Sequence, residues 1–301
     1  MTIINDIQEL KHERNAVILA HNYQRPEVQD IADYVGDSIE LSRRARDESD
    51  AKTILFAAVD FMAESAAILN PEKKVLLPNL GSRCPMAHML PAEQLVIWKQ
   101  KHPRVPVVLY VNTLAEAKAE CDVCCTSANA VEIVKALDSE TVLFGPDYNL
   151  AEYVQEKTGK RVIPIPPQGF CPTHLLFTPE DISAKKQKNP EAVVAVHPEC
   201  SKQVRELADF IGSTSQICRY AKASSSEKFI IGTEIGLLHK LRKENPSKQF
   251  LPAYSGAICT AMKLTTLEGI YRSLKEEKHL ITVPKNTAEK ARKALDRMFA
   301  L

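Results

Sequence analysis

Residues 53–84 read TILFAAVDFMAESAAILNPEKKVLLPNLGSRC, and their plan recurs at residues 141–171, TVLFGPDYNLAEYVQEKTGKRVIPIPPQGFC, and at residues 228–259, KFIIGTEIGLLHKLRKENPSKQFLPAYSGAIC. Each block has an apolar run typical of a buried strand, then an amphipathic helical pattern, a second short strand and a Gly-containing loop. Each block ends at a cysteine, namely Cys84, Cys171 and Cys259. These cysteines are 87 and 88 residues apart, which indicates a threefold internal repeat.

The repeat extends upstream of each block. A short β-rich run precedes a polar residue in every case, namely His21, Tyr110 and His197. A loop of small hydroxyl residues and a further helical pattern follow, and the three loops contain Ser38, Ser127 and Thr214. Strands that alternate with helices of this length indicate parallel sheets, which bind ligands at the carboxyl ends of their strands.

We therefore predict an α/β fold of three pseudo-threefold-related α/β domains. Each domain is expected to be a small parallel sheet flanked by helices in a three-layer αβα arrangement. The predicted repeats cover residues 1–85, 86–172 and 173–260. Residues 261–301 are expected to form a C-terminal helical segment that packs back on the domains.

The overall charge excludes some kinds of partner. Lys plus Arg number 39 and Asp plus Glu 38, a net charge of +1, so no global basic field favours nucleic acid or an anionic membrane. The first residues, MTIINDIQE, lack the basic and apolar regions of a signal peptide, and no apolar run is long enough to span a bilayer. We therefore expect a cytoplasmic protein, in which the eight cysteines are thiols or metal ligands.

The three repeated cysteines are candidate metal ligands. Equivalent loops of three domains around an axis would meet at that axis and bring three thiolates together. Three thiolates suit zinc or an iron–sulfur cluster with one iron left open. The alternative is that they are ordinary buried thiols. We prefer that interpretation for the cysteines outside the repeat, Cys121, Cys124, Cys125, Cys200 and Cys218.

Hydroxyl and titratable residues complete the candidate site. Ser38, Ser127 and Thr214 each precede a helical pattern, so we expect them to cap helices whose N-termini attract anions. His174 follows Cys171 by three residues, and Glu199 follows His197 by two, which places a possible acid or base beside an imidazole. The remaining members of the polar set are His21, Tyr23, Tyr110 and Asn112.

Several motifs together resemble the quinolinate synthetase A family. They are AHNYQRPEVQDIADYVGDS at 20–38, DFMAESAAIL at 60–69, YVNT at 110–113, CTSANA at 125–130, GFCPTH at 169–174, HPEC at 197–200, GSTS at 212–215 and GTEIGLLHKL at 232–241. The resemblance covers nearly the whole chain. It implies a quinolinate synthase that condenses iminoaspartate with dihydroxyacetone phosphate, with loss of phosphate and water, in de novo NAD biosynthesis.

The resemblance also implies the site residues and partners. It implies one [4Fe–4S] cluster with one open iron and three ligands, Cys84, Cys171 and Cys259. The residues implied in substrate binding are His21, Ser38, Tyr110, Val111, Asn112, Ser127, His197, Pro198, Glu199 and Thr214. The implied catalytic residues are His21, Tyr23, Tyr110, His174, His197 and Glu199. A partner enzyme, aspartate oxidase or dehydrogenase, would supply the iminoaspartate.

Two other functions remain open at this point. The first is a hydro-lyase that uses an open-iron cluster on another hydroxy acid. The second is a zinc-stabilised protein that binds small anions without catalysis. Iron content, colour and the reaction catalysed would distinguish them.

Overall fold

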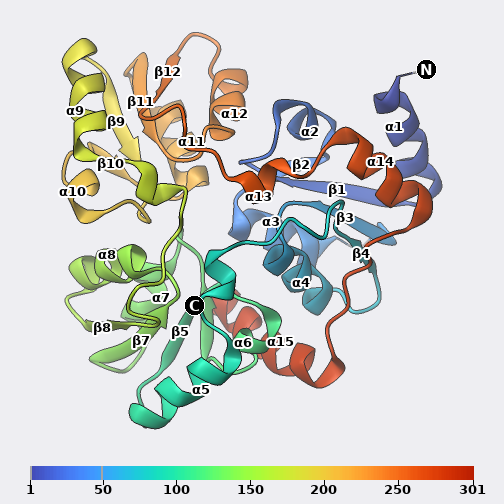
Figure 1. The fold of residues 1–301 in the computed structure, drawn as a ribbon, viewed down its shortest axis with the longest axis horizontal. Helices are drawn as coiled ribbons and strands as arrows, with labels where there is room; N and C mark the ends of the chain where they lie inside the picture. The colour runs from blue at the N-terminus through green and yellow to red at the C-terminus, as the bar shows by residue number, and fades with distance from the viewer. Residues whose placement is uncertain (1, 49) are drawn as a thin grey trace.

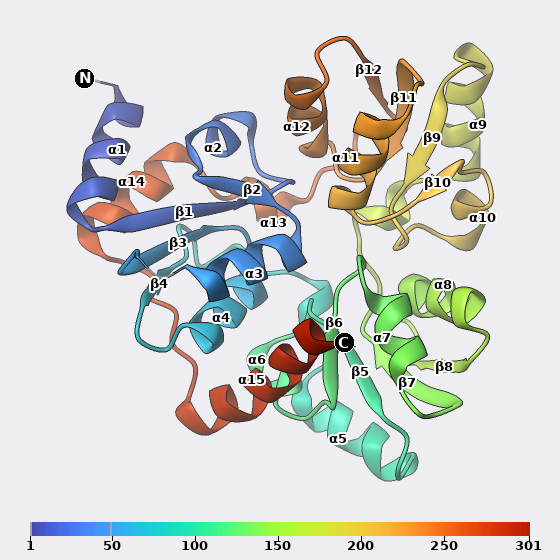
Figure 2. The same cartoon turned by 180° about the vertical axis from the view of Figure 1, so that it is seen from behind.

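Three four-stranded parallel sheets form the framework of the molecule. The computed structural model describes residues 2–48 and 50–301. The strand orders are β2-β1-β3-β4, β6-β5-β7-β8 and β10-β9-β11-β12, so the three sheets share one topology. Figure 1 shows the three units arranged around a common centre, and Figure 2 shows the same arrangement from behind. The predicted fold of three repeated α/β units is confirmed.

Every unit alternates helix and strand four times. The first unit contains α1 (Ile3–Glu13), β1 (Ala16–His21), α2 (Pro26–Ile31), β2 (Tyr34–Gly36), α3 (Ser38–Asp47), β3 (Thr53–Ala57), α4 (Asp60–Leu69) and β4 (Lys74–Leu76). The second contains α5 (Ala92–Lys101), β5 (Val107–Tyr110), α6 (Ala115–Lys118), β6 (Val123–Cys125), α7 (Ala130–Ala136), β7 (Thr141–Gly145), α8 (Tyr148–Thr158) and β8 (Arg161–Pro164). The third contains α9 (Pro179–Lys188), β9 (Val193–Val196), α10 (Lys202–Arg205), β10 (Phe210–Ile211), α11 (Thr214–Ala223), β11 (Lys228–Gly232), α12 (Leu237–Glu244) and β12 (Gln249–Pro252).

Helices cover both faces of each sheet, and the sequence of the central strands reflects this. The strands β1, β3, β5, β7, β9 and β11 are short apolar runs whose residues are almost all buried. A strand that is buried on both faces needs no alternation of polar and apolar residues. Polar residues therefore gather where these strands end.

The repeat extends to individual hydrogen bonds at the amino ends of the strands. In each unit an aspartate just before the edge strand accepts a hydrogen bond from a backbone N–H near the start of the central strand. The pairs are Asp33 with Ile18 at 2.8 Å, Asp122 with Val107 at 2.7 Å and Asp209 with Val194 at 2.8 Å. We call Asp33, Asp122 and Asp209 the strand-start carboxylates. They lie at the edge of each sheet opposite to the carboxyl ends of its strands.

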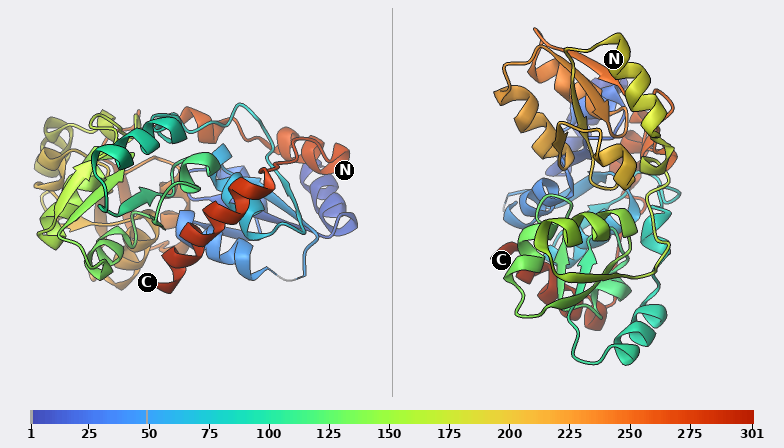
Figure 3. Two further views of the ribbon diagram at one scale, coloured as in Figure 1. Left: turned by 90° about the horizontal axis from the view of Figure 1, so that it is seen from below. Right: turned by 90° about the vertical axis from the view of Figure 1, so that its left-hand side faces the viewer.

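The C-terminal helices tie the units together. α13 (Thr260–Lys263) is a single turn, α14 (Leu267–Glu276) packs against α1, and α15 (Lys285–Ala300) packs against α4, α6 and β6. Figure 3 shows α15 lying across the junction of the first and second units. The point along the chain at which each domain ends stays a prediction.

The first and second units share a hydrophobic cluster that the third unit does not join. One cluster of buried apolar residues is continuous through the first and second units and includes α15, whereas the third unit has clusters of its own on the two faces of its sheet. Polar contacts join the third unit to the first near the centre: Ser213 Oγ donates to Asp37 Oδ2 at 3.0 Å, and Asn22 Nδ2 donates to Thr214 Oγ1 at 2.8 Å. Within the part of the chain that the structure describes, no helix combines the length and apolar character needed to cross a membrane.

Candidate active site

A single cavity at the centre of the three units gathers most of the predicted site residues. Its empty volume, which includes space open to solvent, is ≈ 660 Å³. The predicted residues that line it are His21, Tyr23, Ser38, Cys84, Tyr110, Asn112, Ser127, Cys171, His174, His197, Glu199, Thr214 and Cys259. All three units contribute, because the carboxyl ends of their central strands face the cavity.

Two predicted binding residues, Val111 and Pro198, do not line this cavity. Val111 is buried, and its backbone N–H donates to the carbonyl of Cys125 at 2.7 Å. Pro198 is buried between His197 and Glu199. Their role in binding stays a prediction.

The sequence did not indicate several other lining residues. These are Asp37, Val59, Phe61, Met62, Met86, Thr126, Thr173 and Met262. The apolar ones sit in or beside helices where the sequence pattern marks only a buried helix face. Nothing in that pattern shows that the face borders a cavity.

The three repeated cysteines enter the cavity in the same way. Each precedes a single helical turn, namely η1 (Met86–His88), η2 (His174–Leu176) and α13. In each turn the backbone N–H three residues after the cysteine faces its sulfur; the donors are Ala87, His174 and Met262. Burial raises the pKa of all three thiols above the ordinary value, and their sulfurs are electrostatic neighbours. Coordination to a metal would stabilise them as thiolates.

The other cysteines lie outside this cavity. Cys124, Cys125, Cys200 and Cys218 are buried thiols, as predicted, and Cys121 is partly buried. The sulfurs of Cys121 and Cys124 are 3.9 Å apart in the second unit. Neither lines the central cavity.

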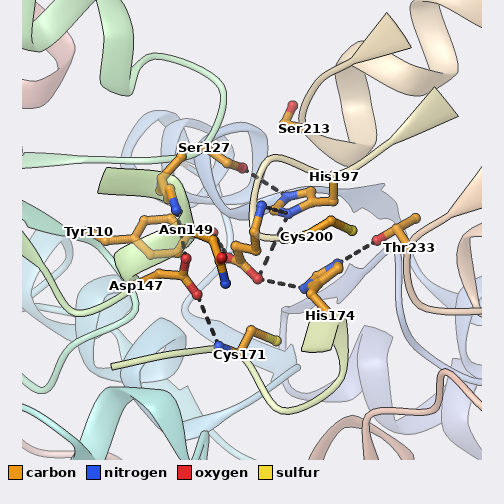
Figure 4. Close-up of polar contacts among 12 residues, drawn as sticks. Tyr110, Ser127, Asp147, Asn149, Cys171, His174, His197, Cys200, Ser213 and Thr233 are labelled. Carbon is orange, nitrogen blue, oxygen red and sulfur yellow. Dashed lines mark hydrogen bonds and ion pairs between the residues drawn. The ribbon is translucent and has the colours of Figure 1, made fainter. Parts of the chain in front are cut away.

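Glu199 is the centre of a buried hydrogen-bond network. Tyr110 Oη donates to its Oε1 at 2.5 Å, and His174 Nδ1 lies 2.6 Å from its Oε2. The His174 and His197 rings stack with centroids 4.4 Å apart, and His197 Nε2 lies 3.1 Å from Ser127 Oγ. Figure 4 shows Tyr110 and Ser127 of the second unit close to His174 and His197 of the third.

The environment sets the charge of each member of this network. Burial opposes ionisation of Glu199, but His197, His174 and the hydrogen bonds from His174 and Tyr110 hold its pKa below the ordinary value. Burial lowers the pKa of His197 to about 3, and burial together with Lys263 lowers that of His21 to about 3. At neutral pH, Glu199 is therefore an anion, and His21 and His197 are neutral imidazoles.

A chain of hydroxyl and imidazole groups connects Tyr23 to Glu199. Tyr23 Oη lies 2.6 Å from Thr233 Oγ1, and Thr233 Oγ1 lies 2.9 Å from His174 Nε2. His174 Nδ1 on the other side of the ring lies 2.6 Å from Glu199 Oε2, so the two ring nitrogens link the Thr233 hydroxyl to the carboxylate. Burial raises the pKa of Tyr23 well above its ordinary value, so its hydroxyl keeps its proton. Thr233 follows the end of β11 and was not predicted.

The helix caps differ from those predicted. Ser38 and Thr214 are the first residues of α3 and α11, and the caps are Asp37 and Ser213, whose side chains accept from backbone N–H groups of the first turn. Ser127 lies three residues before α7, whose start has no side-chain cap bond. The prediction that the three hydroxyl residues cap helices was therefore wrong. Their hydroxyls line the cavity instead, free of a capping role.

Two further features are those expected of a cavity that holds a ligand or a metal. Among the residues that the structure describes, the buried Oδ1 of Asn112 has no hydrogen-bond partner. A buried polar atom without a partner is costly, and a bound ligand would satisfy it. In addition, the Cys171 sulfur, a His174 ring nitrogen and a Glu199 oxygen lie within 4.8 Å of one another, a grouping that could hold a metal ion.

Comparison with known proteins gives a consistent result. A family model described as quinolinate synthetase A protein matches residues 5–300. The quinolinate synthase of Pyrococcus horikoshii is 52% identical over 301 residues, which is 100% of this chain and 99% of that protein. The quinolinate synthase of Thermotoga maritima is 52% identical over 299 residues, 99% of both chains.

Proposed function

Because the chain belongs to the quinolinate synthetase A family, we propose that it condenses iminoaspartate with dihydroxyacetone phosphate to form quinolinate, with loss of phosphate and water. One observation carries this proposal. The cysteines that end three equivalent loops line the same cavity as the buried network around Glu199. Metal ligands and proton-transfer groups are thus next to one another, as a condensation followed by dehydration requires.

We propose that Cys84, Cys171 and Cys259 hold one [4Fe–4S] cluster. The donor set fits this cofactor, because three soft thiol ligands line the cavity and none of the other described cysteines does. When bound, such a cluster supplies a Lewis-acidic iron with an open coordination position. Zinc, which usually takes four ligands, would need a fourth donor such as His174 or Glu199.

Other residues that line the cavity are suited to anionic substrates. Ser38 and Thr214 are the first residues of α3 and α11, where the helix dipoles and backbone N–H groups favour a carboxylate or phosphate. The Ser127 hydroxyl and the Asn112 amide add neutral hydrogen-bonding groups. Binding by His21, Tyr110, His197 and Glu199, with the backbone at Val111 and Pro198, is part of the proposal.

Proton transfer is assigned to the groups whose environment suits it. Conversion of the imine to an enamine, attack on the carbonyl and ring closure each move a proton. We assign these transfers to His21, His197 and Tyr23, which line the cavity; the Tyr23 hydroxyl can donate through Thr233 to His174 Nε2. Glu199, which accepts from Tyr110, lies 2.6 Å from His174 Nδ1 and can orient the His174 ring.

The reaction also implies a supplier of its nitrogen-containing substrate. An imine hydrolyses in water, so it has to be produced from aspartate close to the time of use. We propose that an oxidase or dehydrogenase acting on aspartate supplies it.

The direct test is an anaerobic assay of purified chain reconstituted with iron and sulfide. We expect quinolinate to form only when iminoaspartate and dihydroxyacetone phosphate are both present. A cluster-loaded protein that makes no quinolinate, but dehydrates another hydroxy acid, would favour the hydro-lyase. A colourless protein with stoichiometric zinc and no turnover would favour the anion-binding protein.

A further inference from the structure

A carboxylate in each unit accepts a hydrogen bond from the backbone N–H of the cysteine that ends that unit's loop. The pairs are Asp60 with Cys84 at 3.0 Å, Asp147 with Cys171 at 3.0 Å and Glu234 with Cys259 at 3.1 Å. We call Asp60, Asp147 and Glu234 the loop carboxylates. Figure 4 shows the bond between Asp147 and Cys171.

The number of residues between each carboxylate and its cysteine changes with the length of the carboxylate side chain. Asp60 and Asp147 each precede their cysteine by 24 residues, and Glu234 precedes Cys259 by 25. The unit with one more residue between the partners thus has the carboxylate with one more methylene. The same bond is formed in all three units despite this difference in sequence.

A backbone hydrogen bond accompanies each carboxylate. It joins the backbone next to the carboxylate to the carbonyl two residues before the cysteine. The bonds run from Asp60 N to Ser82 O at 2.9 Å, from Tyr148 N to Gly169 O at 2.8 Å and from Ile235 N to Ala257 O at 3.1 Å. Two hydrogen bonds therefore join each cysteine loop to the segment that follows the carboxyl end of β3, β7 or β11.

The loop carboxylates also have second partners that hold them in place. His88 Nε2 lies 2.7 Å from Asp60 Oδ2, and Lys263 Nζ lies 2.9 Å from Glu234 Oε1. Asp147 is fully buried, and its other oxygen accepts from Leu150 N at 2.7 Å. Within residues 2–48 and 50–301 no cation lies within ion-pair distance of Asp147, so backbone N–H groups are its main partners.

We propose that Asp60, Asp147 and Glu234 are positioning residues for the cofactor site: each fixes the backbone of one cysteine so that the three sulfurs face one point. This inference rests on the proposed function, because the cofactor is the cluster proposed above. A carboxylate that occupies the cysteine N–H also keeps this donor away from the sulfur atoms. Hydrogen bonds to the sulfur atoms of a cluster change its reduction potential. Residues that hold the metal ligands in place affect how tightly the metal is bound.

The competing explanation is that these carboxylates only stabilise helix starts, as Asp147 does for α8. The strand-start carboxylates allow the two explanations to be separated. Asp122 lies in the same unit as Asp147 and also accepts from a backbone N–H, that of Val107, at 2.7 Å. It does so at the opposite edge of the sheet and on an exposed residue, so Asp122→Asn is a control for a carboxylate that bonds the backbone away from the cysteine loops.

The experiment compares the two variants by hydrogen exchange of the metal-free full chain and by iron release from the reconstituted protein to a chelator. An amide side chain can accept at one atom only, so Asp147→Asn cannot keep both backbone bonds. We expect exchange in the segment around Cys171 to become up to about tenfold faster, since a buried hydrogen bond of its backbone N–H is lost. We also expect iron release to become about tenfold faster. Asp122→Asn should leave iron release unchanged, because its one amide oxygen can still accept from the Val107 N–H.

Several results would overturn the inference. The first is an Asp147→Asn variant in which hydrogen exchange around Cys171 and iron release both keep their wild-type rates. Equal acceleration of iron release in Asp122→Asn would do so as well, because it would show a general loss of stability. If Asp147→Asn does not fold, Asp60→Asn gives the same test at Cys84, since the Asp60 side chain is 15% exposed. A wild-type chain that binds no cluster would contradict the proposed function, whereas hydrogen exchange of the metal-free chain would still decide the role of the carboxylates.

Discussion

Replacing Tyr110 by Phe removes one oxygen atom from the centre of the site and leaves the aromatic ring in place. The Tyr110 hydroxyl donates to Glu199 Oε1 at 2.5 Å, and both side chains are buried. The other carboxylate oxygen keeps His174 Nδ1 at 2.6 Å. The variant therefore deletes one of the two short contacts of a buried anion.

The size of the effect follows from these contacts. A hydrogen bond to a charged group contributes about 1.5–3 kcal/mol, and Glu199 is too deeply buried for water to replace the hydroxyl freely. We expect the free energy of unfolding at pH 7 to fall by about 1.5–3 kcal/mol. The pKa of Glu199 should rise by about one unit for each 1.4 kcal/mol that is lost, since the hydroxyl stabilises the charged form.

Denaturant unfolding of the metal-free chain under reducing conditions measures this change. Tyr220→Phe is the control, because Tyr220 stacks on Phe210 with centroids 4.2 Å apart and its hydroxyl has no hydrogen bond to any residue that the structure describes. The control should change stability by less than about 0.5 kcal/mol. Equal stability of Tyr110→Phe and Tyr220→Phe would refute the claim that Tyr110 holds Glu199 as a buried anion.

Two further predictions concern catalysis and pH. Tyr23→Phe should keep the fold and the visible absorption of the cluster but lose turnover, because it breaks the 2.6 Å contact to Thr233; near-normal turnover would remove Tyr23 from the catalytic set. Burial lowers the pKa of His21 and His197 to about 3 in the folded chain, whereas the unfolded chain binds both protons below pH 6.5. Stability should therefore fall as the pH falls from 6.5 towards 4, with these two groups contributing up to about 2.7 kcal/mol per pH unit. Unfolding curves at several pH values measure this slope, and His197→Gln should reduce it by about 1.4 kcal/mol per pH unit; an unchanged slope in that variant would contradict the assignment.

The fold could be predicted from the sequence because the repeat consists of patterns among residues that are close in sequence. Apolar runs, helical periodicity and cysteine spacing repeat about every 87 residues, and each pattern depends only on near neighbours. The family resemblance drawn from the motifs is confirmed by the match over residues 5–300. The convergence of thirteen predicted residues on one cavity followed from the rule that strand ends bind ligands.

The features that the sequence did not predict depend on how the units meet. Tyr23 and Thr233 are 210 positions apart, and only the packing of the first unit against the third brings them together. The helix caps were wrong by one residue at two sites, because Asp37 and Ser213 are as suitable for capping as their neighbours. A signal for the loop carboxylates was present, since an acidic residue stands at the seventh or eighth position of each repeated block. An acidic residue before a helix is so common that it does not by itself indicate a role in a metal site.

Iron and acid-labile sulfide content, measured after anaerobic reconstitution of six single-serine variants, tests the central claim most directly. We expect Cys84→Ser, Cys171→Ser and Cys259→Ser each to lose the cluster, because each removes one of three thiolate ligands. Cys121→Ser, Cys124→Ser and Cys125→Ser should retain it, because their sulfurs lie outside the central cavity. Loss of the cluster in Cys124→Ser together with its retention in Cys84→Ser would contradict the account.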